Sequence, residues 1–388
     1  MAALAWVLLA LVAGATVYSA LVVVAAIRYR RARPVGQAFP PAQTEPVSIL
    51  KPLSGLDEGL EENLRSFFRQ DYPDFELLFA VRNAGDPAVA VVEKLRAEFT
   101  GVPVQIVLTG EPPWTNPKCY SLDRMLAQSR HELIVMSDSD TRVGPELLAT
   151  LAAEFSDPRL GLASCPYRAV GGHDLWTRLE AVGLNTEMLA GVLADRMLEG
   201  VRFGLGPVMG ARRKAIDAAG GFAQFQNYLT EDLLIGRRIA ERGFGTILSS
   251  CVIEHRLGTQ TWRANLAHRL RWMRGGRRMR PAGYVGQLFT YPLPLALALW
   301  AVRPGWWPMV AAALAVRVAS AWATAVLVVR DGSLLRRPWL LPIQDLLGFG
   351  LWIAGFFGRT VSWRGRRYVL NPDGTFQPAG GSSHPLGG

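Results

Sequence analysis

The first 27 residues of this 388-residue chain carry no charged side chain. About 20 apolar residues suffice for a helix to cross a bilayer, so this run is long enough to span one. Four arginines follow it directly, namely Arg28, Arg30, Arg31 and Arg33. A cleaved signal peptide has its basic residues before a shorter apolar core. We therefore interpret residues 1–27 as an uncleaved transmembrane anchor, and because arginines stay on the cytoplasmic side, the next domain is expected in the cytoplasm.

Two further apolar runs lie in the C-terminal part of the chain. Val285–Val302 and Trp306–Val329 predict a transmembrane helical hairpin, with Arg303-Pro304-Gly305 at its turn. Arg317 falls inside the second run. A charge at that depth is unfavourable, so its side chain is expected to face protein or a lipid headgroup.

A third apolar run, residues 339–358, is interrupted by Pro342 and Asp345. We predict a transmembrane or re-entrant segment there. Arginine clusters lie on both sides of the run, and a single crossing would place one of them on the wrong face. A re-entrant or interfacial segment is therefore favoured, followed by a cytoplasmic tail over residues 359–388.

The charge pattern favours a membrane surface over a nucleic acid as the partner of the basic residues. The net charge of +10 comes largely from arginines that flank apolar runs, which suits a negatively charged membrane surface. The sequence has no RNA-binding signature and no zinc-ligand spacing, so we expect no nucleic-acid partner. The three scattered cysteines predict no disulfide framework, and they fit a reducing compartment.

Short apolar segments alternate with helical patterns through residues 38–280. The predicted strands are Val47–Leu50, Phe75–Val81, Val104–Leu108 and Leu133–Met136, and the predicted helices between them cover 61–68, 88–99 and 122–127. This alternation predicts an α/β domain with a mostly parallel, doubly wound sheet. The sequence contains no Gly-x-Gly-x-x-Gly or Walker-type loop, which argues against a dinucleotide-binding fold and an ordinary phosphate-loop NTPase.

Two carboxylates follow the last of these predicted strands. Asp138 and Asp140 lie at its carboxyl end, where open α/β sheets bind ligands. Residues two apart in an extended segment point to the same side, so both can share one cation. Mg²⁺ takes carboxylate oxygens together with substrate phosphates. The pair therefore predicts a metal–diphosphate site, although an Asp-x-Asp pattern alone also fits a polar turn.

Five short motifs, taken in their order along the chain, resemble those of a known family. They are Val47–Gly55 (VSILKPLSG), Asp71-Tyr72-Pro73, Gly85-Asp86-Pro87, Asn116-Pro117-Lys118 and Asp138-Ser139-Asp140. Together they resemble the ceramide glucosyltransferases, glycosyltransferase family 21, and the related bacterial hopanoid-associated glycosyltransferases. The resemblance covers residues 45–280 and extends into the tail. It implies a GT-A fold, a nucleotide-sugar donor, a divalent metal (Mg or Mn) and a membrane-lipid acceptor.

The resemblance also implies roles for single residues near the donor. Asp86 matches an aspartate near the nucleotide base, although a helix N-cap explains it equally well. Asp138 matches the aspartate of the metal and diphosphate site. Asp140 stands where ceramide glucosyltransferases often have glycine, which leaves open which carboxylate holds the metal. Lys118 is expected to meet a phosphate or shape the donor pocket, and a solvated surface lysine is the alternative.

The reacting group is expected further along the chain. Asp232 follows Thr230 and Glu231 and matches the family's catalytic base, although a helix cap at Thr230 with an acidic first turn would explain the triplet structurally. His268-Arg269-Leu270-Arg271-Trp272 resembles the family's (Gln/Arg)-x-x-Arg-Trp motif, with His268 departing from it. Arg271 is expected at the diphosphate and Trp272 at the acceptor. A juxtamembrane amphipathic helix is the alternative.

These observations predict an integral protein of a bacterial inner membrane with its catalytic domain in the cytoplasm. We expect an inverting glycosyltransferase that moves a hexose, glucose from UDP-glucose, onto a lipid hydroxyl such as that of ceramide. The alternatives are a hopanoid-lipid N-acetylglucosaminyltransferase using UDP-N-acetylglucosamine, a processive polysaccharide synthase, and a non-catalytic membrane scaffold with a transferase-like fold. The sequence alone leaves the choice among them open.

Overall fold

The computed structural model describes residues 2–32, 45–363 and 366–379. A seven-stranded sheet forms the centre of the α/β part, in the order β3-β2-β1-β4-β8-β6-β9. Its strands are β1 (Val47–Pro52), β2 (Phe75–Val81), β3 (Val104–Leu108), β4 (Leu133–Ser137), β6 (Leu160–Ser164), β8 (Val208–Arg212) and β9 (Gly245–Leu248). Only β8 runs antiparallel to its neighbours, so the sheet is mostly parallel, as predicted.

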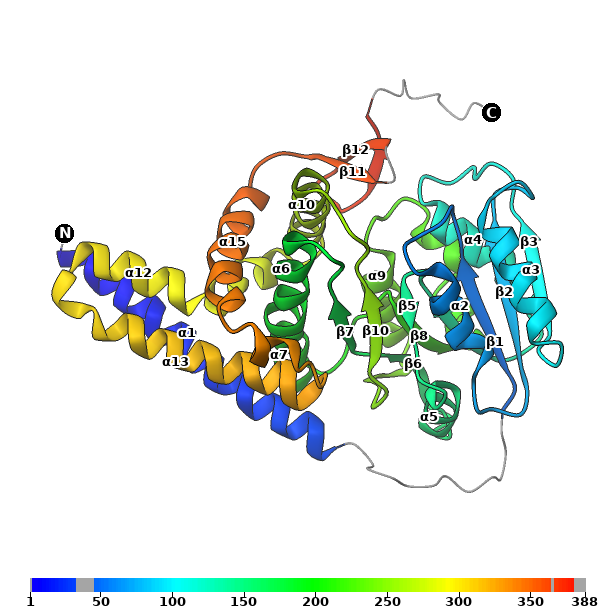
Figure 1. The fold of residues 1–388 in the computed structure, drawn as a ribbon, viewed down its shortest axis with the longest axis horizontal. Coiled ribbons are helices and arrows are strands. Elements are labelled where there is room, and N and C mark those ends of the chain that lie inside the picture. Colours follow the sequence, from blue (N-terminus) through cyan, green and yellow to red (C-terminus); the bar gives the residue numbers. More distant parts are fainter. Residues whose placement is uncertain (1, 33–44, 364–365, 380–388) are drawn as a thin grey trace.

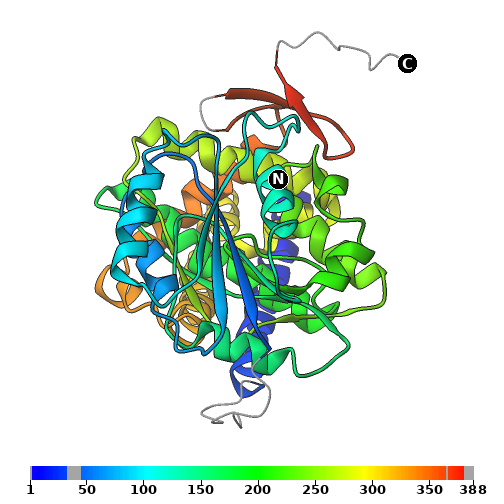
Figure 2. The same cartoon turned by 90° about the vertical axis from the view of Figure 1, so that its right-hand side faces the viewer.

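Helices cover both faces of this sheet because successive strand residues point to opposite sides (Figures 1 and 2). Ile49 packs with one set of helices and Leu50 with the other. The first set is α2 (Leu60–Phe68), α3 (Ala88–Glu98), α5 (Leu147–Glu154) and α7 (Leu189–Leu198). The second is α4 (Pro117–Leu126), α8 (Arg213–Ala218) and α9 (Glu231–Glu241), with the short helix η2 (Phe222–Phe225).

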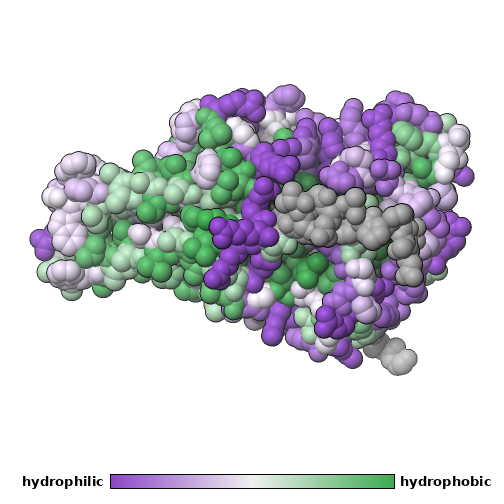
Figure 3. All heavy atoms as spheres, turned by 90° about the horizontal axis from the view of Figure 1, so that it is seen from below, coloured by the Kyte–Doolittle hydropathy of each residue, from purple (hydrophilic) through white to green (hydrophobic). Residues whose placement is uncertain are grey.

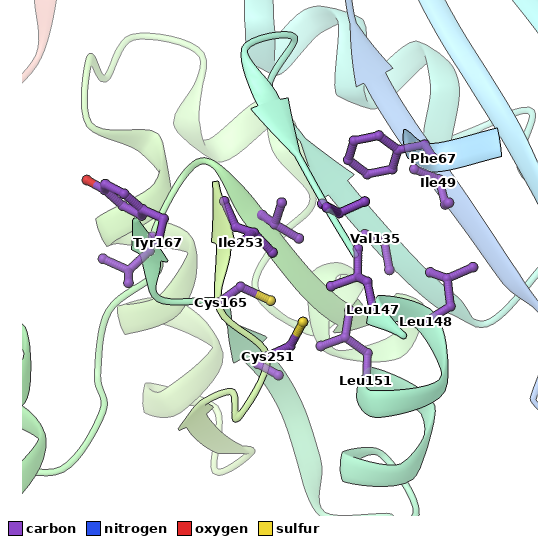
Figure 4. Close-up of a cluster of buried hydrophobic side chains, with 14 of the residues drawn as sticks. Ile49, Phe67, Val135, Leu147, Leu148, Leu151, Cys165, Tyr167, Cys251 and Ile253 are labelled. Atoms are coloured by element: carbon purple, nitrogen blue, oxygen red, sulfur yellow. The ribbon is translucent and has the colours of Figure 1, made fainter. Parts of the chain in front are cut away.

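Part of the core lies between the sheet and α5, where Leu147, Leu148 and Leu151 of α5 face the strands (Figure 4). Cys165 and Cys251 enter the same cluster, and all three cysteines of the chain are buried and free. Small buried thiols act here as apolar packing groups.

Two smaller sheets flank the main one. The first has the order β5-β10-β7, with β5 (Thr141–Arg142), β7 (Tyr167–Val170) and β10 (Ile253–Arg256). The second is antiparallel, with β11 (Thr360–Trp363), β12 (Arg366–Leu370) and β13 (Phe376–Pro378). A single bridge from Tyr228 to Thr375 joins this last sheet to the loop before α9.

A narrow bundle of three helices projects from the α/β part: α1 (Ala2–Arg31), α12 (Pro292–Val302) and α13 (Pro308–Trp322) (Figure 1). The N-terminus and the α12–α13 turn, which contains η4 (Pro304–Trp306), lie together at its free end, where Trp6 packs edge-on against Trp306 at 6.1 Å. Two helices of the described chain are long and apolar enough to cross a membrane, Ala2–Arg31 and Pro304–Val328. Figure 3 shows a continuous hydrophobic surface over this bundle that gives way to a hydrophilic one on the α/β part.

The stretch predicted as a single run over 285–302 is divided in the structure. It comprises α11 (Pro281–Gly286), η3 (Gln287–Thr290) and α12, with a bend of 66° before Pro292. Pro292 has no backbone N–H and cannot continue the hydrogen-bond ladder of a preceding helix. If the bent pair forms one span, the described chain has three candidate spans.

The remaining helices lie between the bundle and the sheets. They are α6 (Leu175–Gly183), α10 (Trp262–Met279), α14 (Ser333–Arg336) and α15 (Leu340–Gly355), with π-helical turns η1 (Leu184–Met188) and η5 (Ala323–Val328). The outward face of α15 is apolar, with Ile343, Leu346 and Ile353 each more than 40% exposed. Its inward face carries Gln344 and Asp345, which are fully buried.

Four buried charged residues meet where α13, α15, η1 and α10 come together, and we call them the membrane-side cluster: Arg317, Asp345, Glu187 and Arg269. Arg317 donates from Nε to both carboxylate oxygens of Asp345 at 2.9–3.0 Å and from Nη2 to Thr186. Gln344 connects the rest, because it donates to Glu187 and accepts from Arg269, each at 3.0 Å. Arg317 thus faces protein, as its depth in the apolar run predicted.

Candidate functional site: carboxylates at the strand edge

The turn after β4 carries Asp138, and a buried lysine holds this turn by hydrogen bonds. Lys51, at the end of β1, donates to the Asp138 carbonyl at 2.7 Å, to Ser137 Oγ at 2.9 Å and to Thr141 Oγ1 at 3.3 Å. Its ammonium also lies 3.7 Å from the centroid of the Phe67 ring. Burial lowers the pKa of Lys51 to about 7, against the opposing effect of Asp138 and Asp140. All three N–H donors of the ammonium are used, which fixes the turn.

A second lysine connects Asp138 to the start of α9. Lys118 Nζ lies 2.6 Å from Asp138 Oδ1 and 3.1 Å from Glu231 Oε1. Burial opposes its charge, but Asp138 and Glu231 outweigh that effect and raise the pKa of Lys118 well above its usual value. For Asp138, burial is the largest effect and raises the pKa, while Lys118 opposes it.

Asn116 explains why Lys118 stands where it does. Its side-chain oxygen accepts from the backbone N–H groups of Lys118 and Cys119, which caps α4, and Pro117 occupies the first turn. Its amide donates to Tyr228 O at 2.8 Å and to Glu231 Oε2 at 3.1 Å. The Asn-Pro-Lys motif therefore joins the start of α4 to the segment that carries the predicted base.

Asp140 is paired differently. His255 Nε2, from β10, lies 3.5 Å from Asp140 Oδ2, and the backbone N–H of Arg256 donates to the Asp140 carbonyl at 2.7 Å. Burial disfavours the charge of Asp140, but His255 outweighs it and lowers the pKa of that carboxyl to about 2. Burial likewise opposes protonation of His255, yet the charge of Asp140 raises its pKa. Asp140 Oδ1 and His255 Nδ1 are buried and have no hydrogen-bond partner among the described residues.

Asp232 lies in the first turn of α9. Its Oδ2 accepts from the backbone N–H of Gly206, and its Oδ1 accepts from its own neighbour Leu233, both at 2.9 Å. A β-carbon at Gly206 would lie 2.9 Å from Oδ2, so a larger residue there would displace the Asp232 carboxylate. Burial and the adjacent Glu231 raise the pKa of Asp232 to about 6, against the opposing effect of Lys118. A fixed carboxylate with a raised pKa is suited to accept a proton near neutral pH.

The buried Tyr167 lies close enough to these carboxylates to be affected by their charge. Burial, Asp232 and Glu180 are the largest effects that raise the pKa of the Tyr167 hydroxyl, and Asp140 adds to them. Tyr167 also packs against His255, with ring centroids 5.3 Å apart. We call Lys118, Asp138, Asp140, Glu231, Asp232 and His255 together the strand-edge cluster.

The (His)-x-x-Arg-Trp motif lies on α10. His268 Nδ1 lies 2.9 Å from Glu180, and Trp272 donates from its indole N–H to His268 Nε2 at 3.2 Å. Nε2 must accept that bond, so Nδ1 carries the proton that His268 shares with Glu180. One helical turn beyond Arg271, a β-carbon at Gly275 would lie 3.2 Å from Thr230, so this face of α10 packs beside the start of α9.

The structure thus brings Lys118, Asp138 and the start of α9 together through contacts of 2.6–3.1 Å, with Asp140 beside them. Asp86 lies apart: it accepts from the backbone N–H groups of Gly55 and Ala88 and so joins the ends of β1 and β2. The Trp272 side chain bonds to His268 of its own helix and is 39% exposed.

Sequence reasoning missed Lys51, Glu231 as a partner of Lys118, and His255. Their only sequence signals are a lysine directly after a strand, an acidic residue beside Asp232, and a lone histidine. The structural alternative for the triplet holds in part: Thr230 stands at the N-cap of α9 and Glu231 and Asp232 lie in its first turn. The Thr230 hydroxyl makes no capping bond, however, and is buried without a partner among the described residues.

A divalent metal has a chemically suitable pair of ligands here. Asp138 and Asp140 offer hard oxygen donors, and the unpartnered Asp140 Oδ1 is the kind of atom that such an ion satisfies. Within the described residues, no group of three or more His, Cys, Asp or Glu side chains converges on one point. The two carboxylates would therefore hold an ion together with oxygens that a substrate supplies.

Comparison with known proteins agrees with this geometry. A mannosyltransferase from Pyrobaculum calidifontis, solved in complex with GDP-Man and Mn²⁺, superposes with a TM-score of 0.53 at 20% identity, covering 91% of this chain and 97% of that one. At that identity the match shows the fold, which is therefore of the GT-A type. A model described as "Glycosyl transferase family 21" matches residues 7–376. The chain belongs to glycosyl transferase family 21.

Two curated relatives show the range of similarity. Ceramide glucosyltransferase 3 of Caenorhabditis elegans is 31% identical over 208 residues, which are 53% of this chain and 44% of that protein. The beta-monoglucosyldiacylglycerol synthase of Synechocystis sp. is 26% identical over 214 residues, which are 53% of this chain and 42% of that protein. The chain thus matches less than half the length of each of these relatives.

Proposed function

We propose that this protein is an inverting glycosyltransferase that moves a hexose from a nucleotide sugar onto the hydroxyl of a membrane lipid. The observation that carries the proposal is Asp232, a carboxylate fixed by two backbone N–H groups, with a pKa raised to about 6, beside the Lys118–Asp138 pair. Relatives named for glucosyl transfer to ceramide and for a glucosyldiacylglycerol support UDP-glucose as the donor and a lipid hydroxyl as the acceptor.

The proposed reaction is a single displacement at the anomeric carbon. Asp232 takes the proton from the lipid hydroxyl while the oxygen forms its bond to that carbon. The bond from the carbon to the diphosphate breaks, and the nucleoside diphosphate leaves with the electron pair. Lys118 and Arg271 stabilise the negative charge on the leaving group. Mg²⁺ or Mn²⁺ held by Asp138 and Asp140 supplies further charge stabilisation when bound.

We also propose how the chain lies in a bilayer. Three segments cross it: α1, α13 with its continuation η5, and the bent pair of α11–η3 with α12. The N-terminus and the α12–α13 turn lie on the outer side and the α/β domain lies in the cytoplasm. α15 has 16 residues and an apolar outward face, which suits an interfacial position and not a full crossing. The acceptor would then reach α10 from the membrane surface that α15 faces.

The test uses the purified full chain in nanodiscs that contain ceramide or diacylglycerol, with radiolabelled UDP-glucose in one arm and UDP-N-acetylglucosamine in the other. The proposal expects label in a lipid product only with active enzyme and only with UDP-glucose. Label from UDP-N-acetylglucosamine alone would replace the donor in the proposal. Long polysaccharide products would favour a processive synthase, and failure to bind either nucleotide sugar would favour a non-catalytic scaffold.

A further inference from the structure

An open cavity of about 410 Å³ lies beside the last turn of α1, outside the strand-edge cluster. Three elements form its walls: α1 provides Arg28, α7 provides Arg196 and Met197, and β9 provides Thr246, Ile247 and Leu248. β9 is the terminal strand of the main sheet and is separated from β4 by β8 and β6. The cavity is therefore at a different edge of the domain from Asp138 and Asp232.

The two arginines have charges that nothing in the described chain neutralises. No carboxylate of the described residues forms an ion pair with Arg28 or Arg196, because the acidic neighbours on α7 are engaged elsewhere: Asp195 and Glu199 both pair with Arg280. Arg196 is held in place over the ring of Tyr29, with its guanidinium carbon 5.4 Å from the ring centroid. A positioned and unpaired guanidinium is a strong donor for a phosphate.

The position of the cavity along the chain narrows the choice of ligand. Arg28 is the first charged residue after the 27-residue uncharged run, so it stands where α1 would leave the hydrocarbon layer. Apart from Thr246, the other wall residues are apolar, namely Met197, Val201, Ile247 and Leu248. A ligand that fits must offer an anion to one wall and an apolar part to the other, at the level of the membrane surface.

We propose that this cavity binds the headgroup of a negatively charged phospholipid. Arg28 and Arg196 contact the phosphate, and the aliphatic wall contacts the adjoining glycerol backbone. The volume suits a headgroup and the start of the acyl chains, which continue along α1 into the bilayer. This inference depends on the proposed membrane placement of α1, but not on the reaction at Asp232.

The experiment measures how much phosphatidylglycerol the purified full chain retains in neutral detergent micelles, by native mass spectrometry. The test variant is Arg28→Gln with Arg196→Gln. The matched control is Arg30→Gln with Arg31→Gln, which removes the same number of positive charges, both from the end of α1, but spares the cavity. We expect the test variant to bind the lipid about 10-fold or more weakly, and the control to stay within about 2-fold of the unmodified chain.

Equal loss in both variants would overturn the proposal, because it would show general attraction to the basic helix end. Displacement of the lipid by inorganic phosphate at an equal concentration would overturn it too, since the site would then recognise a free anion. If the loss of Arg196 lowers the melting temperature, the same lipid measurement is made on Arg28→Gln alone. Arg28 is an exposed side chain, so this change is expected to weaken lipid binding without unfolding the protein. Lipid retention without any sugar transfer would leave this inference standing and count against the proposed function alone.

Discussion

Charged side chains gather at two places in this molecule, and their hydrogen bonding differs. In the membrane-side cluster, both Asp345 oxygens accept from Arg317, and both Glu187 oxygens accept bonds, from Gln344 and Tyr291. In the strand-edge cluster, Asp140 Oδ1 and His255 Nδ1 are buried without partners among the described residues, and so is Thr230 Oγ1, next to Glu231. In the first group every carboxylate oxygen has a partner, and the buried atom without one is a donor, Arg269 Nη1. In the second group the unpartnered atoms include a carboxylate oxygen and an imidazole nitrogen, which are the kinds of atom that a metal ion or a substrate can contact.

This difference in hydrogen bonding indicates which buried charged residues are expected to take part in chemistry. A closed ion-pair network fixes the positions of the helices that contribute to it, because each partner would be left buried and unpaired if another moved. An incomplete network that places like charges side by side has shifted pKa values and open coordination positions. We therefore expect the strand-edge cluster to bind the donor and react, and the Arg317–Asp345 pair with Gln344 to hold α10, α13 and α15 together.

The largest expected effect tests the proposed catalytic role of the strand-edge cluster. Asp232→Asn should lower kcat about 1,000-fold, because the acceptor hydroxyl loses its proton acceptor. Binding of UDP, measured by calorimetry, should stay within about 2-fold, since Asp232 does not contact Lys118 or Asp138. Retained turnover in this variant would remove Asp232 from its role.

The next largest effect tests the structural role of the membrane-side cluster. Arg317→Met should reduce the free energy of unfolding by about 3–5 kcal/mol, because it leaves Asp345 buried and unpaired. Arg317→Met combined with Asp345→Leu should recover most of that loss. Melting temperatures in detergent measure both, and a double variant as unstable as the single one would contradict the pairing.

A smaller effect is expected at the lysine between the carboxylates. Lys118→Met should weaken UDP binding about 10-fold, because one cation near the diphosphate is lost, and should leave uridine binding unchanged. Lys94→Met is the matched control, since Lys94 is 61% exposed and pairs only with Glu61 at the surface. Equal effects of both changes on UDP would show that overall charge, and not this contact, matters.

The smallest effect is a pH dependence. The pKa of Asp232 is raised to about 6, so the carboxyl is increasingly protonated below that pH and can no longer accept a proton. We expect kcat/KM to be level above about pH 7 and to fall about 10-fold per unit below pH 6. A decline centred near pH 4, the ordinary value for aspartate, would show that burial and Glu231 do not control this group.

The sequence predicted the parts of the fold that depend on local patterns. β2 and β3 have the predicted bounds, and Asp138 and Asp140 follow a strand because a buried apolar run ends there. α4 begins at Pro117, five residues before the predicted start at Leu122. The Asn-Pro pair that starts it was a visible capping signal, but we had interpreted those residues only as part of a motif.

Contacts between distant segments could not be predicted in this way. The pairing of His255 with Asp140 depends on the antiparallel register of β10 and β5, which places His255 opposite Thr141. The position of Lys51 under the Asp138 turn depends on β1 and β4 being parallel neighbours. Neither register has a signature in the sequence of either segment.

The hydrogen bond from the Tyr29 hydroxyl to the Ser249 carbonyl, at 2.6 Å, has a mechanical consequence. It fastens the end of α1 to the residue that follows β9. α1 has 30 residues and is therefore about 45 Å long, which exceeds a hydrocarbon layer of about 30 Å. In the proposed membrane placement a tilted α1 accommodates this excess, and the bond passes any change of tilt on to the edge of the sheet. We therefore expect a thicker bilayer to change the height of the α/β part above the membrane surface.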